Sequence, residues 1–513
     1  MTNRKQVHDV IKNSKDKHLA RVREYMAQPS VSREDEAGVK ACAELLKGYF
    51  LEIGCQEAEV AETPRLPSVW AHYDAGASKT LAVYGYFDTN LVGTGWTHDP
   101  YDVVLAEHKP FKEVVYGCGS GSKGGFAAFL NALESIIEVE GTLPVNLMFL
   151  IEGEEFLGSG NIPILIERYR DKLETADGLV WNGPAQNAIG DVSLSLGNKG
   201  CLHIELQCTG DRWGRGPQGG TTHSSTMGVV DHPVWRLVHA LSTLYDPETN
   251  KVLVEGFYDD LREPNEDELL LVDKIIDRFA GQDASAGALV GNPDRIKHFR
   301  DDMDGRDAFM SYCFQPTMNI NGLRGGFTGP GTTLWTLPNE AYCTIDHRIP
   351  PDLDPDDLSE KIRAHLDAHG YGDIGIEVLM NVTSSTLSVQ DPLAKAGIRV
   401  LEDWGIEPVI WPRKGASGPP GYFSTLLGLN VLSSTGIGHA TGHGSPDEFL
   451  VIEGDGKVGG LVELEQSYVD LLYSYANYPG DEPRIRPTAL YGGFGRMHFG
   501  DYFQLMHNWE LDI

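Results

Sequence analysis

The stretch "PVNLMFLIEGEE", residues 144–155, decides the fold. It is a continuous apolar run that ends in acids, which predicts a buried strand. The preceding stretch "GGFAAFLNALESII" (124–137) has helical spacing and opens with glycines, and "KTLAVYGYFD" (79–88) is a second buried strand that ends in an acid. This strand, helix, strand alternation predicts a mostly parallel sheet with helices on both faces. We therefore expect functional side chains at the carboxyl ends of these strands.

Beyond "GNKGCLHIELQCTG" (197–210) the pattern changes to alternating strands and an acidic insert. We expect an inserted α+β domain there, and from "DPLAKAGIRVLEDWG" (391–405) onward helices and short apolar strands resume. The predicted organisation is an α/β/α catalytic domain (1–199 and 385–479), an inserted lid domain (200–384) and an aromatic C-terminal extension (480–513).

Composition narrows the classes of function. The 513 residues carry 42 Lys plus Arg against 74 Asp plus Glu, a formal charge of -32, so the field repels nucleic acid and anionic membrane surfaces. The 7 cysteines form no C-x-x-C pair, and we identify neither a signal peptide nor an apolar segment long enough to cross a bilayer. We expect a cytoplasmic protein that acts on a small molecule.

The acid pair Glu154-Glu155 is the first chemical signal. Adjacent buried carboxylates coexist only with a metal or with a raised pKa, so they indicate proton transfer or cation binding. The alternative is a solvated loop after a strand. Five other islands favour a site: "GYFDTN" (85–90), "YGCGSGSKGG" (116–125), "TTHSSTMG" (221–228), "DHRIPPD" (346–352) and "GHATGHGSPDEF" (438–449).

In this order, over nearly the whole chain, the islands resemble the co-catalytic zinc peptidase family of carnosinase, aminoacylase and succinyl-diaminopimelate desuccinylase. The segments "VLVEGFYDDLR" (252–262) and "NINGLRGGFTGPGTTLWTLP" (319–338) make the carnosinase-like branch nearest. The resemblance implies a zinc-peptidase catalytic domain interrupted by a smaller lid domain, which in that family commonly mediates dimerisation. A homodimer is therefore expected.

The zinc ligands implied by the resemblance are mostly replaced. Tyr86 stands where the family has a histidine, two residues before the orienting Asp88, and Gly121 stands where the bridging aspartate belongs, two residues before Lys123. Asn182 replaces a further aspartate ligand.

The surviving matches are Glu154 for the general base, and Glu155 and His443 for ligands of the second zinc, with His439 or Asp88 as conceivable substitutes. Since zinc sites normally use at least three protein ligands, we expect no metal cofactor, the alternative being one zinc or other divalent ion.

The residues that contact substrate in the family are retained. His223 matches the lid histidine that reaches the partner's active site and stabilises the oxyanion, and Arg348 matches the arginine that binds the substrate carboxylate. Ser417, in "GASGPPGYF" (415–423), resembles a contact near that carboxylate. Without the resemblance, a loop histidine, a surface ion pair and a turn serine are the simpler interpretations.

Three hypotheses follow. The first is an amide hydrolase of a dipeptide or N-acyl amino acid, with Glu154 activating water, His223 holding the oxyanion, Arg348 fixing the carboxylate, and Tyr86 and Lys123 as substitute donors. The second is a metal-independent epimerase, isomerase or lyase that uses Glu154 in the same pocket. The third is a non-catalytic small-molecule-binding protein.

Overall fold

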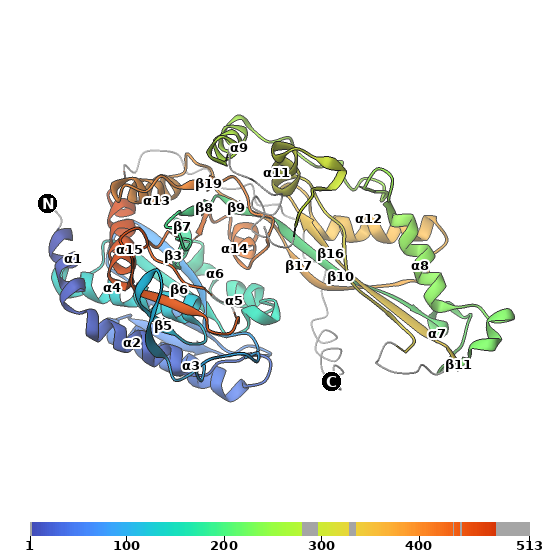
Figure 1. Cartoon of the computed structure of the whole chain (residues 1–513), viewed down its shortest axis with the longest axis horizontal. Helices are drawn as coiled ribbons and strands as arrows, with labels where there is room; N and C mark the ends of the chain where they lie inside the picture. The colour runs from blue at the N-terminus through green and yellow to red at the C-terminus, as the bar shows by residue number, and fades with distance from the viewer. Residues whose placement is uncertain (1–2, 280–295, 328–334, 434, 442–443, 479–513) are drawn as a thin grey trace.

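The computed structural model describes residues 3–279, 296–327, 335–433, 435–441 and 444–478. Its largest sheet has six strands in the order β1-β2-β6-β3-β7-β20 (Figure 1). The pairs β6–β3, β3–β7 and β7–β20 are parallel, whereas β1 and β2 pair antiparallel at one edge. The strands are β1 (Glu57–Ala61), β2 (Ser68–Tyr73), β3 (Thr80–Tyr86), β6 (Asn146–Glu152), β7 (Gly178–Trp181) and β20 (Val431–Ser433).

Both faces of this sheet are buried, which explains why its central strands are apolar throughout. Along β6, Leu147 and Phe149 pack into the larger core cluster, while Met148 and Leu150 pack into a second cluster on the opposite face. Helices cover the first face as α1 (Arg4–Asn13), α2 (Lys15–Ala27), α3 (Glu36–Ile53), α4 (Gly125–Glu140), α13 (Pro392–Asp403) and α15 (Leu461–Ala476). The second face is covered by α5 (Ile162–Arg168), α6 (Arg170–Leu173) and α14 (Pro420–Leu427).

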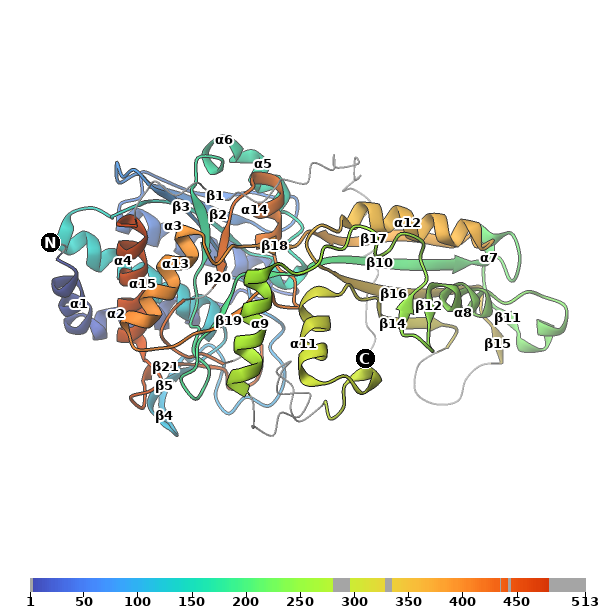
Figure 2. The same cartoon turned by 90° about the horizontal axis from the view of Figure 1, so that it is seen from above.

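A separate four-stranded antiparallel sheet, in the order β14-β16-β10-β17, extends away from the first (Figure 2). Two long helices, α8 and α12, cover one of its faces and enclose a core of their own. The elements are β10 (Gly200–Thr209), β14 (Asn319–Gly325), β16 (Glu340–Ile349), β17 (Gly375–Val382), α7 (Gly210–Trp213), α8 (Pro233–Leu244) and α12 (Pro355–Ala368). The chain passes between the two sheets just before β10 and just after β17.

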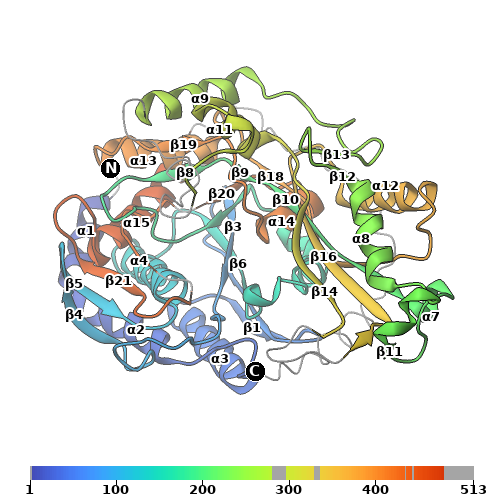
Figure 3. The same ribbon diagram turned by 45° about the vertical axis from the view of Figure 1, so that its right-hand side comes forward.

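Short pairings surround that crossing. The two-stranded sheets β19–β8 and β18–β9 join segments that lie far apart in sequence, and α9 packs against α11 and β19 beside them (Figure 3). These elements are β8 (Ser193–Ser195), β9 (Gly197–Asn198), β18 (Ser385–Thr386), β19 (Val409–Trp411), α9 (Glu266–Phe279) and α11 (Gly305–Phe314). The remaining strands are β4 (Val104–His108), β5 (Phe111–Tyr116), β11 (Thr222–His223), β12 (Tyr245–Asp246), β13 (Lys251–Val252), β15 (Thr336–Leu337) and β21 (Phe449–Glu453).

The predicted fold class is confirmed, with a mostly parallel α/β/α sheet and a second α+β sheet contributed by residues 200–382. All seven cysteines are buried and free. Within the described ranges, no helix has both the length and the apolar character needed to cross a bilayer. The predicted aromatic extension at 480–513 lies outside the described residues.

Candidate active site

A cavity of about 500 Å³ opens at the carboxyl ends of the parallel strands, where the sequence predicted functional side chains. Its wall combines the ends of β3 and β7, the loop after β6 and the segment after β19. The polar side chains that line it are those of Tyr86, Ser122, Glu155, Trp181, Asn182, Ser195, Asn198, Lys414, Ser417 and Ser433. Among the described residues on this wall, Glu155 is the only carboxylate and Lys414 the only ammonium.

Glu155 begins the single helical turn that follows β6. Its carboxylate makes no hydrogen bond or ion pair with a described residue, although its backbone N–H donates to Asp88 Oδ1 at 3.0 Å. Burial, together with the charge of Asp88, raises the pKa of Glu155 to about 7. A carboxyl group that is unpaired, faces a cavity and has a pKa near neutrality is suited to accept and return a proton.

Glu154, which sequence reasoning assigned as the general base, points elsewhere. It is 2% exposed, does not line the cavity, and both of its carboxylate oxygens are occupied. The backbone N–H and the side-chain amide of Asn161 each donate to it at 2.7 Å. The first carboxylate after the strand therefore turns inward and anchors the loop, and the second faces the cavity. Sequence spacing alone gave no means of telling the two apart.

Asp88 and Lys123 both make hydrogen bonds that hold the protein structure and do not face the cavity. The two oxygens of Asp88 accept the backbone N–H groups of Glu155 and Phe156 at 3.0 Å each, so this aspartate orients the turn that carries Glu155. Lys123 is fully buried, and its ammonium donates to the carbonyl of Gln28 at 2.6 Å and to the hydroxyl of Ser30 at 3.2 Å. The expected donor role of Lys123 is corrected by this position, because neither group reaches the cavity wall.

Tyr86 and Asn182 both line the cavity. The Tyr86 ring packs edge-on against Phe156, with centroids 5.8 Å apart, and against Trp181. Asn182 presents a buried amide Nδ2 that has no hydrogen-bond partner among the described residues. An aromatic wall with an unused amide donor is a surface for a neutral polar group such as an amide carbonyl.

The donor set does not fit the two-zinc centre that the resemblance implies. In the part of the chain that the structure describes, no three His, Cys, Asp or Glu side chains lie together as a metal site. The two named substitutes are committed elsewhere. Asp88 accepts backbone N–H groups, and His439 Nδ1 donates to Gln186 O at 2.9 Å, beside Phe111. His443 lies outside the described residues. A phenol and an amide in place of carboxylate and imidazole are poor zinc ligands.

Lys414 is the site residue that sequence reasoning missed. It lies between β19 and Ser417, immediately before the quoted "GASGPPGYF", and its ammonium has no partner among the described residues. Burial lowers the pKa of this ammonium. A signal was available in the sequence, namely a lysine next to a small-residue loop already suspected of binding a carboxylate. The ammonium of Lys414 places a positive charge on the cavity wall.

Arg348 and Ser417 lie in contact with each other. The guanidinium donates to Ser417 Oγ at 3.0 Å and is held by Asp346, through Nε at 3.0 Å and through a second nitrogen at 2.9 Å. Ser417 in turn donates to Gly200 O at 2.7 Å, at the point where the chain enters the second sheet. Because an arginine has five N–H donors, Asp346 and Ser417 leave donors for an incoming carboxylate.

His223 lies apart from this cavity. It is exposed in β11, at the distal end of the second sheet, where its Nδ1 contacts Ser225 Oγ at 2.8 Å (Figure 2). It does not line the cavity of its own chain. Within one chain, then, the structure brings together Tyr86, Glu155, Asn182 and Ser417, with Arg348 adjacent, and leaves His223 separate.

Comparisons with known proteins agree with this architecture. A family model described as peptidase family M20/M25/M40 matches residues 92–462. The Cys-Gly metallodipeptidase DUG1 of Candida albicans is 26% identical over 383 residues, which cover 70% of this chain and 74% of that relative. The beta-Ala-His dipeptidase of Mus musculus is 23% identical over 377 residues, covering 70% of this chain and 71% of the relative.

Solved structures show the same fold. The M20 family metallo-carboxypeptidase Sso-CP2 from Sulfolobus solfataricus superposes with a TM-score of 0.74 at 27% identity, over 90% of this chain and 99% of the other. The dipeptidase Dug1p from Saccharomyces cerevisiae gives a TM-score of 0.72 at 21% identity, over 93% of this chain and 100% of the other.

Proposed function

The chain belongs to peptidase family M20/M25/M40 and is a peptidase-like hydrolase, and from this premise we propose that it cleaves the C–N amide bond of a small carboxylate-bearing substrate, a dipeptide or an N-acyl amino acid. One observation carries the proposal for this chain. Its cavity holds a carboxylate, Glu155, and an ammonium, Lys414, neither of which pairs with a described residue, and the Arg348–Ser417 pair lies at its edge. Amide hydrolysis needs these three functions: a base, an electrophilic donor and an anchor.

Glu155 takes the role that the sequence had assigned to Glu154. Its carboxylate removes a proton from water, and the resulting hydroxide adds to the amide carbonyl carbon. Lys414 and the Tyr86 hydroxyl donate hydrogen bonds to the oxyanion that forms. Glu155 then returns the proton to the nitrogen, the C–N bond breaks, and a carboxylic acid and an amine leave. Asp88 acts through Glu155 as a positioning residue, because it fixes the turn on which Glu155 lies.

The substrate carboxylate binds at Arg348 and Ser417. Asp346 holds the guanidinium in place through two contacts, so little side-chain entropy is lost on binding. The amide Nδ2 of Asn182, unpaired among the described residues, donates to the substrate's remaining carbonyl.

We also propose that catalysis proceeds without a metal. The support is the donor set: the cavity wall offers one carboxylate, and an ammonium on the same wall repels a cation. A single zinc bound by Glu155 and His443 is the alternative. Elemental analysis of protein purified without chelators separates the two, since about one tightly bound zinc per chain would contradict metal independence.

The active assembly is proposed to be a cytoplasmic homodimer. His223 lies too far along the second sheet to serve its own cavity, and apolar side chains near it are exposed: Val229 (90%), Trp235 (55%) and Trp335 (72%). Exposed aromatic and aliphatic groups of this size indicate a protein interface.

The seven buried cysteines, none of which forms a disulfide, support the proposed cytoplasmic location. The division into 1–199, 200–384 and 385–479 is proposed with it, since each sheet has its own core.

The test is turnover of Cys-Gly, β-Ala-His and N-acetyl amino acids, with EDTA and with added zinc. Hydrolysis that survives EDTA and falls at least a hundredfold in Lys414→Met, with partial recovery in the charge-preserving Lys414→Arg, supports the proposal. Hydrolysis that requires zinc contradicts its metal-free form. If no amide is cleaved but proton exchange at the α-carbon of an amino acid depends on Glu155, the proton-transfer hypothesis takes its place. Carboxylate binding without either reaction points to the non-catalytic one.

A further inference from the structure

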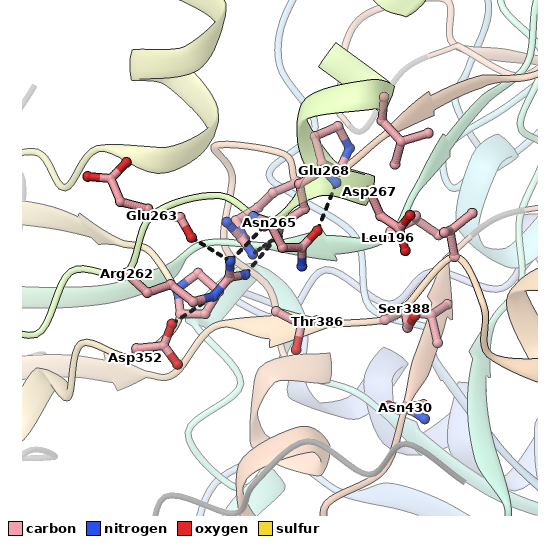
Figure 4. A pocket seen from close by; sticks show the side chains of 16 residues that line it. Leu196, Arg262, Glu263, Asn265, Asp267, Glu268, Asp352, Thr386, Ser388 and Asn430 are labelled. Carbon is pink, nitrogen blue, oxygen red and sulfur yellow. Dashed lines mark hydrogen bonds and ion pairs between the residues drawn. The ribbon is translucent and has the colours of Figure 1, made fainter. Parts of the chain in front are cut away.

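A second cavity, of about 390 Å³, lies where the chain crosses between the two sheets (Figure 4). We call it the hinge cavity. Its wall comes from Leu196 before β9, from Thr386–Val389 at and after β18, from Pro412 and Arg413 after β19, and from the N-terminal turn of α9. The lining residues are Leu196, Arg262, Glu263, Asn265, Asp267, Glu268, Leu271, Pro351, Asp352, Thr386, Leu387, Ser388, Val389, Pro412, Arg413 and Asn430.

The hinge cavity is separate from the active-site cavity but shares a wall with it. Leu196 and Arg413 face the hinge cavity, whereas their chain neighbours Ser195 and Lys414 face the active-site cavity. The segments are joined by a backbone hydrogen bond from Leu196 N to Trp411 O, 2.9 Å long. Successive residues of an extended segment point to opposite sides, which places one cavity on each side of this wall.

Arg413 is the unusual residue of the hinge cavity. It is 1% exposed, yet its guanidinium makes one hydrogen bond to a described residue, a long one of 3.3 Å to Glu268 Oε1. Its buried Nε has no partner among the described residues. Burial lowers the pKa of this guanidinium to about 10. A buried guanidinium with unused N–H donors is costly, and an acceptor that enters the cavity would relieve the cost.

The other charges of the hinge cavity specify what else the occupant carries. Arg262 is fully engaged, because it pairs with Glu268 at 2.6 and 2.7 Å and with Asp352 at 3.0 Å. Two carboxylates are left, those of the exposed residues Glu263 and Asp267, for which no side-chain ion pair is found within the described residues. In Figure 4, Arg262 and Asp352 lie on one side of the cavity, and Ser388 and Asn430 lie on the other.

We propose that the hinge cavity binds a free α-amino acid. Its carboxylate accepts hydrogen bonds from Arg413 at the buried end, and its ammonium lies at the rim beside one of the two acids, Asp267 or Glu263, which Figure 4 shows on opposite sides. Because the lining carries more carboxylates than cationic side chains, it repels phosphate and dicarboxylates. A simple amine, in turn, has no acceptor for the N–H donors of Arg413. A zwitterion satisfies both conditions, and the aliphatic groups of Leu196, Leu271 and Val389 offer a surface for a small apolar side chain. This assignment does not depend on the proposed peptidase activity.

The test is calorimetric titration of the full-length protein with glycine, L-alanine and L-leucine, and with propionate and ethylamine as probes of each charge alone. We expect an amino acid to bind and the two half-probes to bind at least tenfold more weakly. Asp267→Asn combined with Glu263→Gln removes the acceptors of the ammonium and weakens binding about tenfold, the usual value of one charge-assisted contact. Glu266→Gln is the matched control, an exposed acid on the same helical turn that does not line the cavity.

Arg413→Gln removes the carboxylate partner and should abolish binding, but a buried substitution endangers folding, so the two rim acids carry the decisive comparison. An amino acid could also bind in the active-site cavity, and Arg348→Ala separates the two sites. Binding that persists in Arg348→Ala and weakens in the rim double variant supports the proposal. Binding that is lost in Arg348→Ala and unchanged in the rim variant overturns it, as does no binding of any amino acid or equal binding of propionate.

Discussion

Exchanging each member of the acid pair for its amide separates two roles that are one residue apart. Glu155→Gln removes the free carboxylate of the active-site cavity while preserving its shape. Because a positioned general base contributes about 10²- to 10⁴-fold, kcat should fall by that factor, or about 3–5 kcal/mol in barrier height. The fold should be unaffected, since the Glu155 side chain makes no hydrogen bond to a described residue.

Glu154→Gln should do the opposite. The Glu154 carboxylate accepts two N–H donors from Asn161, and an amide in its place turns an N–H toward one of them. An unsatisfied buried donor costs about 1–3 kcal/mol, so the free energy of unfolding should fall by that amount while kcat changes only a few-fold. In urea unfolding, this loss of stability should appear as a lower denaturant midpoint with an unchanged m-value.

The assay is kcat/KM on whichever amide substrate is turned over, measured with urea unfolding of each variant in the same buffer. The reasoning requires that Glu155→Gln lowers kcat without lowering stability and that Glu154→Gln lowers stability with little change in kcat. If Glu154→Gln abolished turnover at full stability while Glu155→Gln stayed active, the assignment of the cavity-facing carboxylate would be refuted. Loss of turnover in both variants at equal stability would refute the division of roles.

Three further predictions rest on other groups. Burial lowers the pKa of Lys199 to about 7, so the folded state binds fewer protons than the unfolded state between about pH 7 and 10.5, and the free energy of unfolding rises with pH in that range. In urea unfolding, the wild type should therefore gain about 2 kcal/mol of stability relative to Lys199→Met between about pH 7 and 9. A stability difference that does not change with pH would contradict this. If His223 acts across a dimer, co-expressed His223→Ala and Glu155→Gln chains should recover about a quarter of wild-type activity from heterodimers with one complete site, whereas action within one chain gives none. Asp88→Ala should lower kcat about tenfold and the free energy of unfolding by about 2 kcal/mol, because two N–H groups of the Glu155 turn lose their acceptor. An unchanged kcat would show that Asp88 does not position Glu155.

The sequence predicted the sheet well because the strands that carry it are long and apolar. The runs at 79–88 and 144–155 became β3 and β6, paired in parallel, and the helix between them became α4. Patterning is informative there since both faces of the sheet are buried and tolerate few polar residues. The edge was harder to predict, because β1 contains two glutamates and is mostly exposed or partly buried, so it lacks the continuous apolar run of the central strands.

The orientation of the acid pair could not be predicted, because β6 ends at Glu152 and the alternation that fixes side-chain direction ends with it. The loop that follows is set by hydrogen bonds from Asn161, seven residues after Glu154, and to Asp88, which lies 67 residues before Glu155. Lys414 was missed for a related reason. Its neighbourhood is formed by β19 pairing with β8, a contact between segments about 200 residues apart that no local pattern reveals.

The substitutions in the active-site cavity are consistent with one another in electrostatic terms. Zinc ligands are thiolate, carboxylate or imidazole groups, and the neutral side chains of Tyr86 and Asn182 do not offset the charge of a bound cation. A lone Glu155 in such a wall would be a buried, uncompensated charge. Lys414 adds an ammonium to the same wall, so the described residues that line the cavity carry one charge of each sign. Because Lys414 supplies the ammonium that faces the oxyanion in the proposed reaction, loss of its charge should impair oxyanion stabilisation.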